Sequence, residues 1–209
     1  MIDLYTWSTP NGRKVSIALE EMGLDYNVHP VDIAKDEQYE PSFLEISPNN
    51  KIPAIVDQDT GLSLMESGAI LLYLANKTGT FMPKAGSEDY WRCIEWLMWQ
   101  MGGFGPMLGQ ANHFLHFNPG KSDYAERRYG DEAERLYDIL DQHLEEREFV
   151  AGSYSIADMA IFPWCARWQW QNIDIDDFDN LKRWYHAIAT RPAVIKGYGV
   201  PKPEDIPLP

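Results

Sequence analysis

Cysteine is scarce in this chain of 209 residues, and its two cysteines, Cys93 and Cys165, do not form a CxxC pair. A thioredoxin-type redox motif and a zinc ribbon both need such pairs, so the sequence excludes these two kinds of site. Both cysteines lie in apolar, helix-patterned surroundings, which is typical of small buried core residues. We therefore expect both cysteines to be structural.

Positive charge is also in short supply, with 18 Lys and Arg against 32 Asp and Glu and a formal net charge of −14. A nucleic-acid-binding protein normally carries the opposite sign, and an anionic membrane surface would repel this chain. The longest apolar run is far too short to span a membrane. The first residues, Met-Ile-Asp-Leu-Tyr, contain no basic and apolar leader. We expect a cytoplasmic protein without nucleic-acid or membrane partners.

Strand signals occur only in the first part of the chain. A strand, a helix and a strand follow one another closely, which indicates a parallel βαβ unit with a right-handed crossover. Asp59-Thr60-Gly61 then predicts a hairpin turn. The resulting order, β-α-β-α-β-β-α, is that of the thioredoxin-like fold. The expected strands are Ile2–Trp7, Tyr26–Val31, Ala54–Asp57 and Leu62–Met65, with helices at Arg13–Met22, around Pro41–Ile46 and from Glu66 onward.

The rest of the chain shows only helical periodicity, so we expect an α/β domain followed by an all-α domain. Ser155-x-x-Asp158 has the form of a capping box, which starts a helix by reciprocal hydrogen bonds. The predicted divisions are a thioredoxin-like domain at 1–79, a linker at 80–86, an all-helical domain at 87–200 and a Pro-rich tail at 201–209 that lies extended on the surface.

The stretch Ser47–Ala75 holds the features that point to a ligand. Ile52 precedes a proline and is therefore biased toward an extended conformation, in which its backbone could pair with an extended peptide. Glu66-Ser67-Gly68 opens an apolar helix, and the free N–H groups of a helix start can hold a carboxylate. Together they form a slot for a small acidic peptide. The alternative is a β-hairpin that leads into a helix with Ser67 as an ordinary cap.

The run I-S-P-N-N-K-I-P-A-I-V-D, followed by L-S-L-M-E-S-G-A-I-L-L-Y-L-A, resembles the glutathione site of cytosolic glutathione transferases. The resemblance covers nearly the whole chain and implies the transferase fold, a homodimer and a cis bond before Pro53. It also implies that Ile52 pairs with the glutathione backbone and that Glu66 and Ser67 hold its γ-glutamyl end. Lys51 and Gln38 are expected at its glycyl end.

In this family the residue that faces the glutathione sulfur follows the first strand, which here means Ser8-Thr9-Pro10-Asn11. The combination of T-P-N-G with the Ser47 motif and G-G-x-G-P-M-L-G-Q resembles the bacterial nu class. That class implies a disulfide-bond reductase with modest transferase activity, which uses two glutathiones or one oxidised glutathione and no protein cysteine. Thr9 would offer a hydroxyl and Asn11 an amide N–H to the thiolate. The alternative for both is a local turn and helix cap.

Four residues of the second half complete the expected site. Met107, His113 and Phe114 are expected to line a second pocket, and Arg128 matches an arginine that the resemblance places on a glutathione carboxylate. Two of these features have a structural alternative. The glycine-rich stretch before Met107 is also typical of a kinked helix, and Arg128 is also typical of a solvated helix face. His113-x-x-His116 has no third ligand at suitable spacing, so we expect no metal.

Two other functions fit this sequence. One is a glutathione S-transferase that conjugates hydrophobic electrophiles. The other is a non-catalytic interaction module with the transferase fold, which would not need the peptide slot at Lys51-Ile52-Pro53 and Glu66-Ser67.

Overall fold

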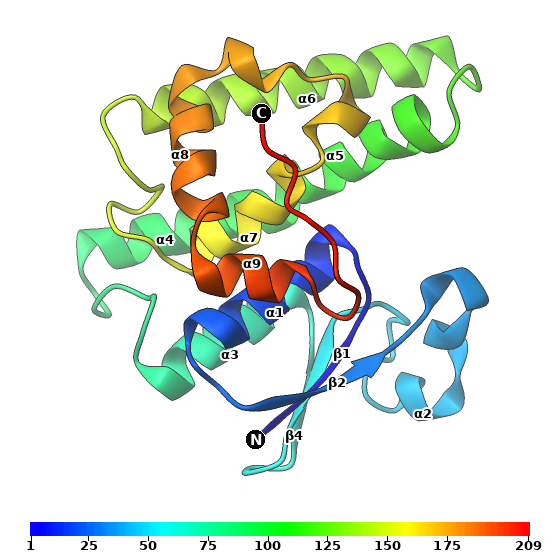
Figure 1. The fold of residues 1–209 in the computed structure, drawn as a ribbon, viewed down its shortest axis with the longest axis vertical. Helices are drawn as coiled ribbons and strands as arrows, with labels where there is room; N and C mark the ends of the chain where they lie inside the picture. The colour runs from blue at the N-terminus through cyan, green and yellow to red at the C-terminus, as the bar shows by residue number, and fades with distance from the viewer. The chain divides into compact units, whose positions relative to one another are not determined.

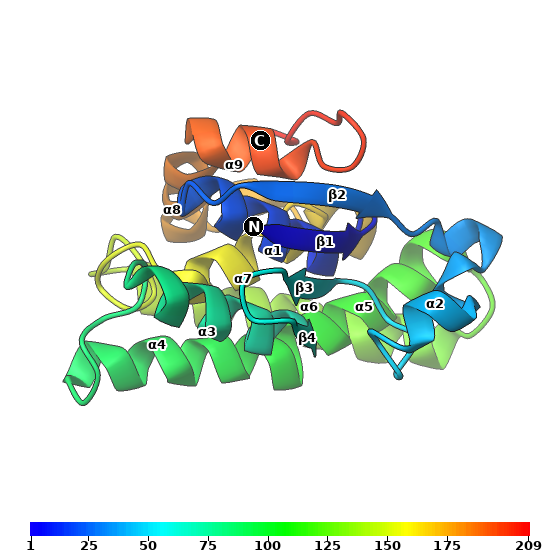
Figure 2. The ribbon, with the colours of Figure 1, turned by 90° about the horizontal axis from the view of Figure 1, so that it is seen from below.

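The computed structural model describes all 209 residues, Met1–Pro209, and divides them into two compact units. The first unit contains a four-stranded sheet in the order β2-β1-β3-β4 (Figure 2). β1 pairs in parallel with β2, and α1 makes the crossover between them, as the sequence predicted. β3 pairs antiparallel with β1 and with β4. The bounds are β1 Ile2–Thr6, α1 Pro10–Glu21, β2 Tyr26–Pro30, β3 Ala54–Asp57 and β4 Leu62–Met65.

The two faces of this sheet follow from the alternation of side chains along its strands. Leu4 of β1 and its partner Ile55 of β3 are fully buried on one face. Tyr5 and its partner Ala54 point to the other face, where Phe43 packs with them. The remaining elements of the first unit are the 3-10 turns Ile33–Lys35 and Glu37–Tyr39, and the helices α2 Pro41–Leu44, α3 Ser67–Thr78 and α9 Pro192–Tyr198.

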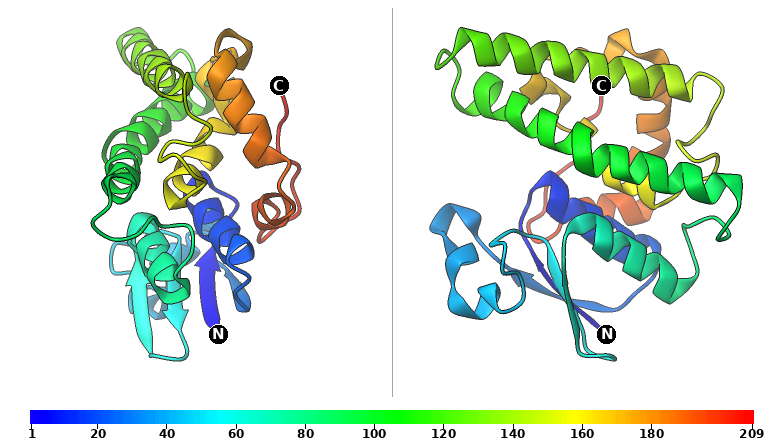
Figure 3. Two further views of the ribbon diagram at one scale, coloured as in Figure 1. Left: turned by 90° about the vertical axis from the view of Figure 1, so that its left-hand side faces the viewer. Right: turned by 180° about the vertical axis from the view of Figure 1, so that it is seen from behind.

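The second unit is entirely helical, apart from an isolated bridge between Phe149 and Gly152. The chain from α4 to Phe117 forms one long, irregular helical run that lies beside α6 (Figure 3). Its elements are α4 Glu88–Trp99, a π-helical turn Gln100–Phe104, α5 Gly105–Ala111, a second π-helical turn Asn112–Phe117, α6 Asp123–Leu144, α7 Ile156–Cys165, the 3-10 turns Trp168–Gln171 and Ile175–Asp177, and α8 Asp179–Ala189. None of the helices is long and apolar enough to cross a membrane.

The predicted capping box at the start of α7 is present. Ser155 accepts a hydrogen bond from the backbone of the first turn, and Asp158 accepts the Ser155 N–H at 2.9 Å. Asp158 also accepts the backbone N–H of Val150 and the indole N–H of Trp184, at 3.1 and 2.9 Å. The carboxylate is fully buried and joins α7 to the preceding loop and to α8. Its role is therefore structural.

The end of the chain differs most from the expected division. The structure places Thr190–Ile206 with the first unit, whereas the sequence assigned 87–200 to the helical domain. The helix α9 in this segment was not predicted, and it lies along α1 (Figure 1). The reason is packing: α9 is short and is held by contacts with α1, such as the hydrogen bond between Ser16 and Gly197, 181 positions apart, which local periodicity does not reveal. The other division falls after Met82, within the expected linker.

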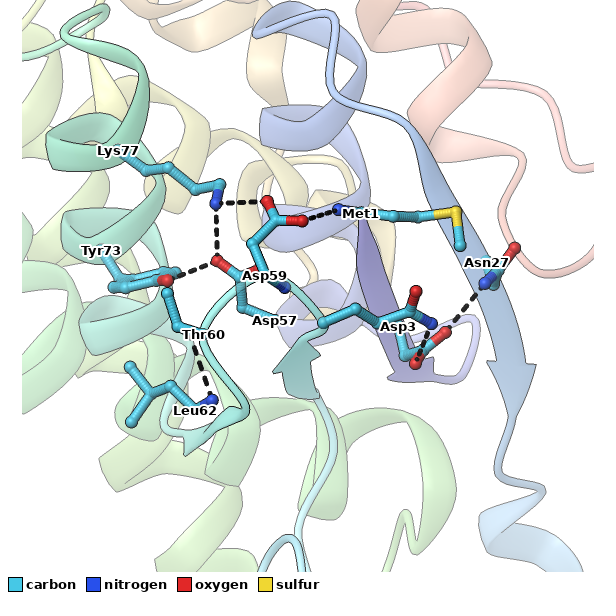
Figure 4. Close-up of polar contacts among 10 residues, drawn as sticks. Met1, Asp3, Asn27, Asp57, Asp59, Thr60, Leu62, Tyr73 and Lys77 are labelled. Atoms are coloured by element: carbon cyan, nitrogen blue, oxygen red, sulfur yellow. Dashed lines mark hydrogen bonds and ion pairs between the residues drawn. The ribbon is translucent and has the colours of Figure 1, made fainter.

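Asp57, at the end of β3, organises a polar cluster on the sheet (Figure 4). The carboxylate is fully buried and lies 2.8 Å from Lys77 Nζ and 2.5 Å from the Tyr73 hydroxyl. Burial alone would raise the pKa of Asp57, but hydrogen bonds from Lys77, Tyr73 and the Asp59 N–H lower it from 3.8 to about 2. The folded state therefore holds the charged form more tightly than the unfolded state does.

We expect Asp57→Asn to lower the free energy of unfolding by about 2 kcal/mol at neutral pH, because it removes the buried anion that pairs with Lys77 and accepts from the Tyr73 hydroxyl. Because the folded-state pKa is depressed, the stabilisation is present above pH 3.8 and is lost as the pH falls toward about 2. Urea unfolding at several pH values measures both effects. The exposed Asp131→Asn is the matched control, and equal stability of the two variants would contradict the prediction.

Candidate functional site

The register of the sheet brings the predicted peptide slot to one edge. Tyr5 at the end of β1 pairs with Ala54 at the start of β3, and Ala54 pairs with Met65 at the end of β4. Adjacent strands lie about 4.8 Å apart. The segments that carry Thr9 and Asn11, Ile52 and Pro53, and Glu66 and Ser67 therefore leave the sheet side by side.

The turn after β1 is tighter than the sequence predicted, because α1 begins at Pro10 and not at Arg13. Thr9 caps the helix, and its hydroxyl oxygen accepts the Gly12 N–H at 3.2 Å. A side chain at Gly12 would meet the Trp7 carbonyl oxygen at 2.3 Å, so glycine permits this close approach of helix and strand. Thr9 therefore caps the helix, as the structural alternative predicted. Accepting this bond leaves its own hydroxyl hydrogen available to donate.

Asn11 occupies the first turn of α1, directly beside the capping residue, and is half-buried. Its amide and the start of a helix both favour an anion at this position. Neither cysteine lies on this unit: Cys93 and Cys165 are fully buried in α4 and α7. Burial raises the pKa of both thiols, so neither is an activated nucleophile.

The second segment of the edge comes just before β3. The Ile52–Pro53 peptide bond is cis, as the resemblance implied. Pro53 is buried and Ile52 half-buried, and both precede the paired part of β3, whose ladder starts at Ala54. Ser47 supports this loop, because its hydroxyl donates to the Lys51 carbonyl at 2.8 Å. The Lys51 side chain is exposed, which leaves its cation accessible.

The third segment is the start of α3, where Ser67 is the first helical residue. Glu66 adopts a positive φ of 69° and is exposed, while Ser67 is 6% exposed. Sequence reasoning missed the residue that stands behind them: Lys14 of α1 is buried and donates from Nζ to Ser67 Oγ at 3.4 Å. Burial lowers the pKa of Lys14 well below its ordinary value, and the charge of Glu66 partly offsets this. The sequence signal that could have indicated this role is the position of Lys14 among apolar residues on one face of the predicted helix.

Gln38 lies on the 3-10 turn Glu37–Tyr39, which follows β2 in the chain. Its amide nitrogen is 3.5 Å from Asp36 Oδ1, at the limit of a hydrogen bond. Its amide oxygen is buried without a hydrogen-bond partner in the protein. A buried acceptor normally has a donor, and the protein supplies none to this oxygen.

In the helical unit, Met107 and Arg128 line one pocket of about 510 Å³. Three arginines, Arg127, Arg128 and Arg135, line this pocket together with two carboxylates, Asp131 and Glu132. Arg135 is paired with Glu132, whose carboxylate also feels the charge of Arg128. The two further arginines of this pocket were not predicted.

His113 and Phe114 do not line that pocket. Phe114 stacks on Tyr129 with ring centres 5.6 Å apart, and His113 contacts Phe114 edge-on. His116 stacks on Trp170 at 4.2 Å. No group of three or more His, Cys, Asp or Glu side chains is placed to hold a metal ion.

The glycine-rich stretch before Met107 forms a π-helical turn from Gln100 to Phe104. A side chain at Gly105 would meet Gln100 Nε2 at 2.5 Å and Trp164 Nε1 at 3.3 Å. At Gly109 an added carbon would lie 3.3 Å from the Trp164 ring. These glycines allow α5 to pack closely on α7, as expected for a kinked helix.

The geometry above is that of a thioredoxin-like ligand site on a two-unit chain, and the comparisons with known proteins agree. The model "Glutathione S-transferase, N-terminal domain" matches residues 1–76, and "Glutathione S-transferase, C-terminal domain" matches residues 104–192. The chain belongs to the glutathione S-transferase family.

Its relatives carry names that are more specific than the family description. Disulfide-bond oxidoreductase YfcG of Escherichia coli is 51% identical over 199 residues, which cover 92% of each chain. Disulfide-bond oxidoreductase YghU of the same organism is 38% identical and covers 94% of this chain and 73% of its own. A glutathione transferase from Pseudomonas putida, crystallised with one glutathione disulfide per subunit, is 43% identical with a TM-score of 0.90 and covers 96% of this chain and 91% of its own.

Proposed function

We propose that this protein is a glutathione-dependent disulfide-bond reductase with accompanying glutathione transferase activity. The observation that carries the proposal is the row of segments at one sheet edge, which offers hydrogen-bond donors, including the buried Lys14 amine, but no cysteine. The relatives named as disulfide-bond oxidoreductases and the structures that contain glutathione support it.

Each end of glutathione finds a matching group in this row. The γ-glutamyl carboxylate would lie at the start of α3, where Ser67, supported by the Lys14 amine, and the free N–H groups of the helix favour an anion. Glu66 would accept the γ-glutamyl ammonium. The backbone of Ile52 would pair with the cysteinyl residue, and Gln38 and Lys51 would contact the glycyl end.

The thiolate would sit at the Thr9–Asn11 turn. A free thiol titrates near pH 8.5, so only a few per cent is ionised at neutral pH. Hydrogen bonds from the Thr9 hydroxyl and the Asn11 amide favour the charged form and lower the pKa of the bound thiol.

The reaction then needs two glutathiones. The first thiolate attacks one sulfur of the substrate disulfide, the substrate S–S bond breaks, and the departing thiolate takes a proton. The second glutathione thiolate attacks the glutathione sulfur of the mixed disulfide and releases the other substrate thiol. The products are glutathione disulfide and two substrate thiols, and the protein itself is neither oxidised nor reduced.

We extend the proposal to the second unit, to the assembly and to the location. Arg128 would contact a glutathione carboxylate, and Met107, His113 and Phe114 would line the second pocket. The excess of arginine over carboxylate in the pocket around Arg128 supports an anionic ligand there, whereas His113 and Phe114 lie outside that pocket. We also propose a homodimer, and a reducing cytoplasm is consistent with two free cysteines.

Calorimetry with reduced and oxidised glutathione tests the binding part of this proposal, and assays with hydroxyethyl disulfide and with a chlorinated arene separate the two activities. The proposal predicts binding of glutathione and faster turnover of the disulfide. Turnover of the arene alone would favour the transferase that conjugates hydrophobic electrophiles. A folded protein that binds neither form of glutathione would be an interaction module and not an enzyme of this kind.

A further inference from the structure

The segment after α8 contributes to the thioredoxin-like unit through α9, which lies along α1 (Figures 1 and 2). The contact is close: a side chain at Gly197 would come within 2.6 Å of the Ile17 Cα. The Ser16 hydroxyl donates to the Gly197 carbonyl at 2.7 Å. Arg191 makes a two-pronged ion pair with Glu21, at 2.6 and 2.9 Å. The C-terminal segment is therefore anchored on the helix whose start carries Asn11.

Beyond α9, the tail contacts both flanks of the turn that carries Thr9 and Asn11. On the strand side, Lys202 Nζ lies 3.9 Å above the centre of the Trp7 ring. On the helix side, Arg13 forms an ion pair with Glu204. The turn Ser8–Gly12 thus lies between two residues that the tail holds.

Arg13 is the stronger of the two anchor points. Its side chain is fully buried, and its guanidinium lies 3.7 Å above the ring of Tyr198 at the end of α9. A buried cation is costly without a paired anion, and Glu204 supplies one from the tail. Because Arg13 follows Gly12 directly, a shift of its side chain would move the first turn of α1.

We propose that Lys202 and Glu204 are positioning residues for the thiolate site, and that they act through the Thr9–Asn11 turn without touching the substrate. This inference rests on the proposed function, because it assigns the turn to the glutathione sulfur. A donor must stay aimed at the sulfur through the reaction, and small misplacements of such groups lower turnover strongly. The tail contacts the turn on both sides through Lys202 and Glu204, and it thereby supplies this constraint.

The test is Glu204→Gln, which keeps the size of the side chain and removes its charge, with the neighbouring exposed Asp205→Asn as the matched control. We expect Glu204→Gln to lower kcat for disulfide reduction about tenfold and to leave the KM for glutathione nearly unchanged, because the turn and not the peptide slot is loosened. Glu204→Asp should recover most of the loss. Lys202→Met, on the opposite flank, should lower kcat in the same direction by a smaller factor.

Two readouts separate positioning from a general loss of structure. Amide hydrogen exchange should become faster in Glu204→Gln at residues 8–14 and stay unchanged in the hairpin 54–65. In an Asn11→Ala background, Glu204→Gln should cause a smaller further loss of kcat, since only Thr9 of the two positioned groups remains.

The proposal is overturned if Glu204→Gln behaves like Asp205→Asn in kcat and exchange, or if its effect is undiminished in the Asn11→Ala background. Faster exchange at residues 8–14 with unchanged kcat would also overturn it. Wild-type protein without glutathione-dependent activity would instead refute the proposed function, and the exchange data would still decide whether the tail holds the turn.

Discussion

Asn11→Ala is expected to lower the turnover of disulfide reduction about 100-fold, because it removes a donor that faces the thiolate in the proposed site. The loss should appear in kcat more than in glutathione binding, since the peptide slot at Ile52, Glu66 and Ser67 is untouched. Alanine is a good helix former, so the first turn of α1 should stay folded. Steady-state kinetics and calorimetry on the same preparations measure the two quantities.

The pH profile makes this prediction sharper. If Asn11 lowers the pKa of the bound thiol, kcat/KM of the variant should rise up to a higher pH than that of the wild type, toward the free-thiol value of about 8.5. The exposed Asn76→Ala on α3 is the matched control. Unchanged kinetics in Asn11→Ala would remove Asn11 from the mechanism and leave Thr9 as the remaining candidate.

The largest loss of stability is expected at Asp158→Ala, about 3–5 kcal/mol in the free energy of unfolding. Burial raises the pKa of Asp158 to about 6, although hydrogen bonds from Trp184, Val150 and Ser155 favour the charged form. Alanine would leave the N–H groups of Val150 and Ser155 and the indole N–H of Trp184 without their acceptor. All three lie inside the helical unit, where water does not replace the carboxylate.

Thermal and urea unfolding of Asp158→Ala measure this loss, with the exposed Asp138→Ala on α6 as the control. Below the midpoint of its unfolding transition, part of the variant should remain folded. These folded molecules should bind glutathione with the affinity of the wild type. A variant that is as stable as the control would show that the capping box contributes little, contrary to its hydrogen bonding.

The sheet was predictable because its signals are local. The hairpin strands Ala54–Asp57 and Leu62–Met65 have the predicted bounds, since Asp59-Thr60-Gly61 sets the turn between two short apolar runs. The start of α1 was placed three residues late, at Arg13. Thr-Pro-Asn-Gly is good turn chemistry, but proline is also favoured at the first position of a helix, and Thr9 caps it there.

The features that sequence reasoning missed depend on contacts between distant residues. Lys14 lies beside Ser67 only because α1 and α3 pack together, and nothing in the spacing of the two residues indicates it. The return of Glu204 to Arg13 joins positions 191 residues apart. A proline-rich tail is typical of an extended surface segment, and the tail is indeed irregular. Its charged side chains nevertheless contact residues on both sides of the turn at the start of α1.

The most direct test of the central claim is disulfide reduction by a cysteine-free variant, Cys93→Ala with Cys165→Ala. If the reacting sulfurs all belong to glutathione, the variant should turn over hydroxyethyl disulfide within about twofold of the wild-type rate. Both cysteines are fully buried, so circular dichroism should first confirm that the fold is kept. A folded variant whose glutathione-dependent rate falls to that of the uncatalysed reaction would contradict the account.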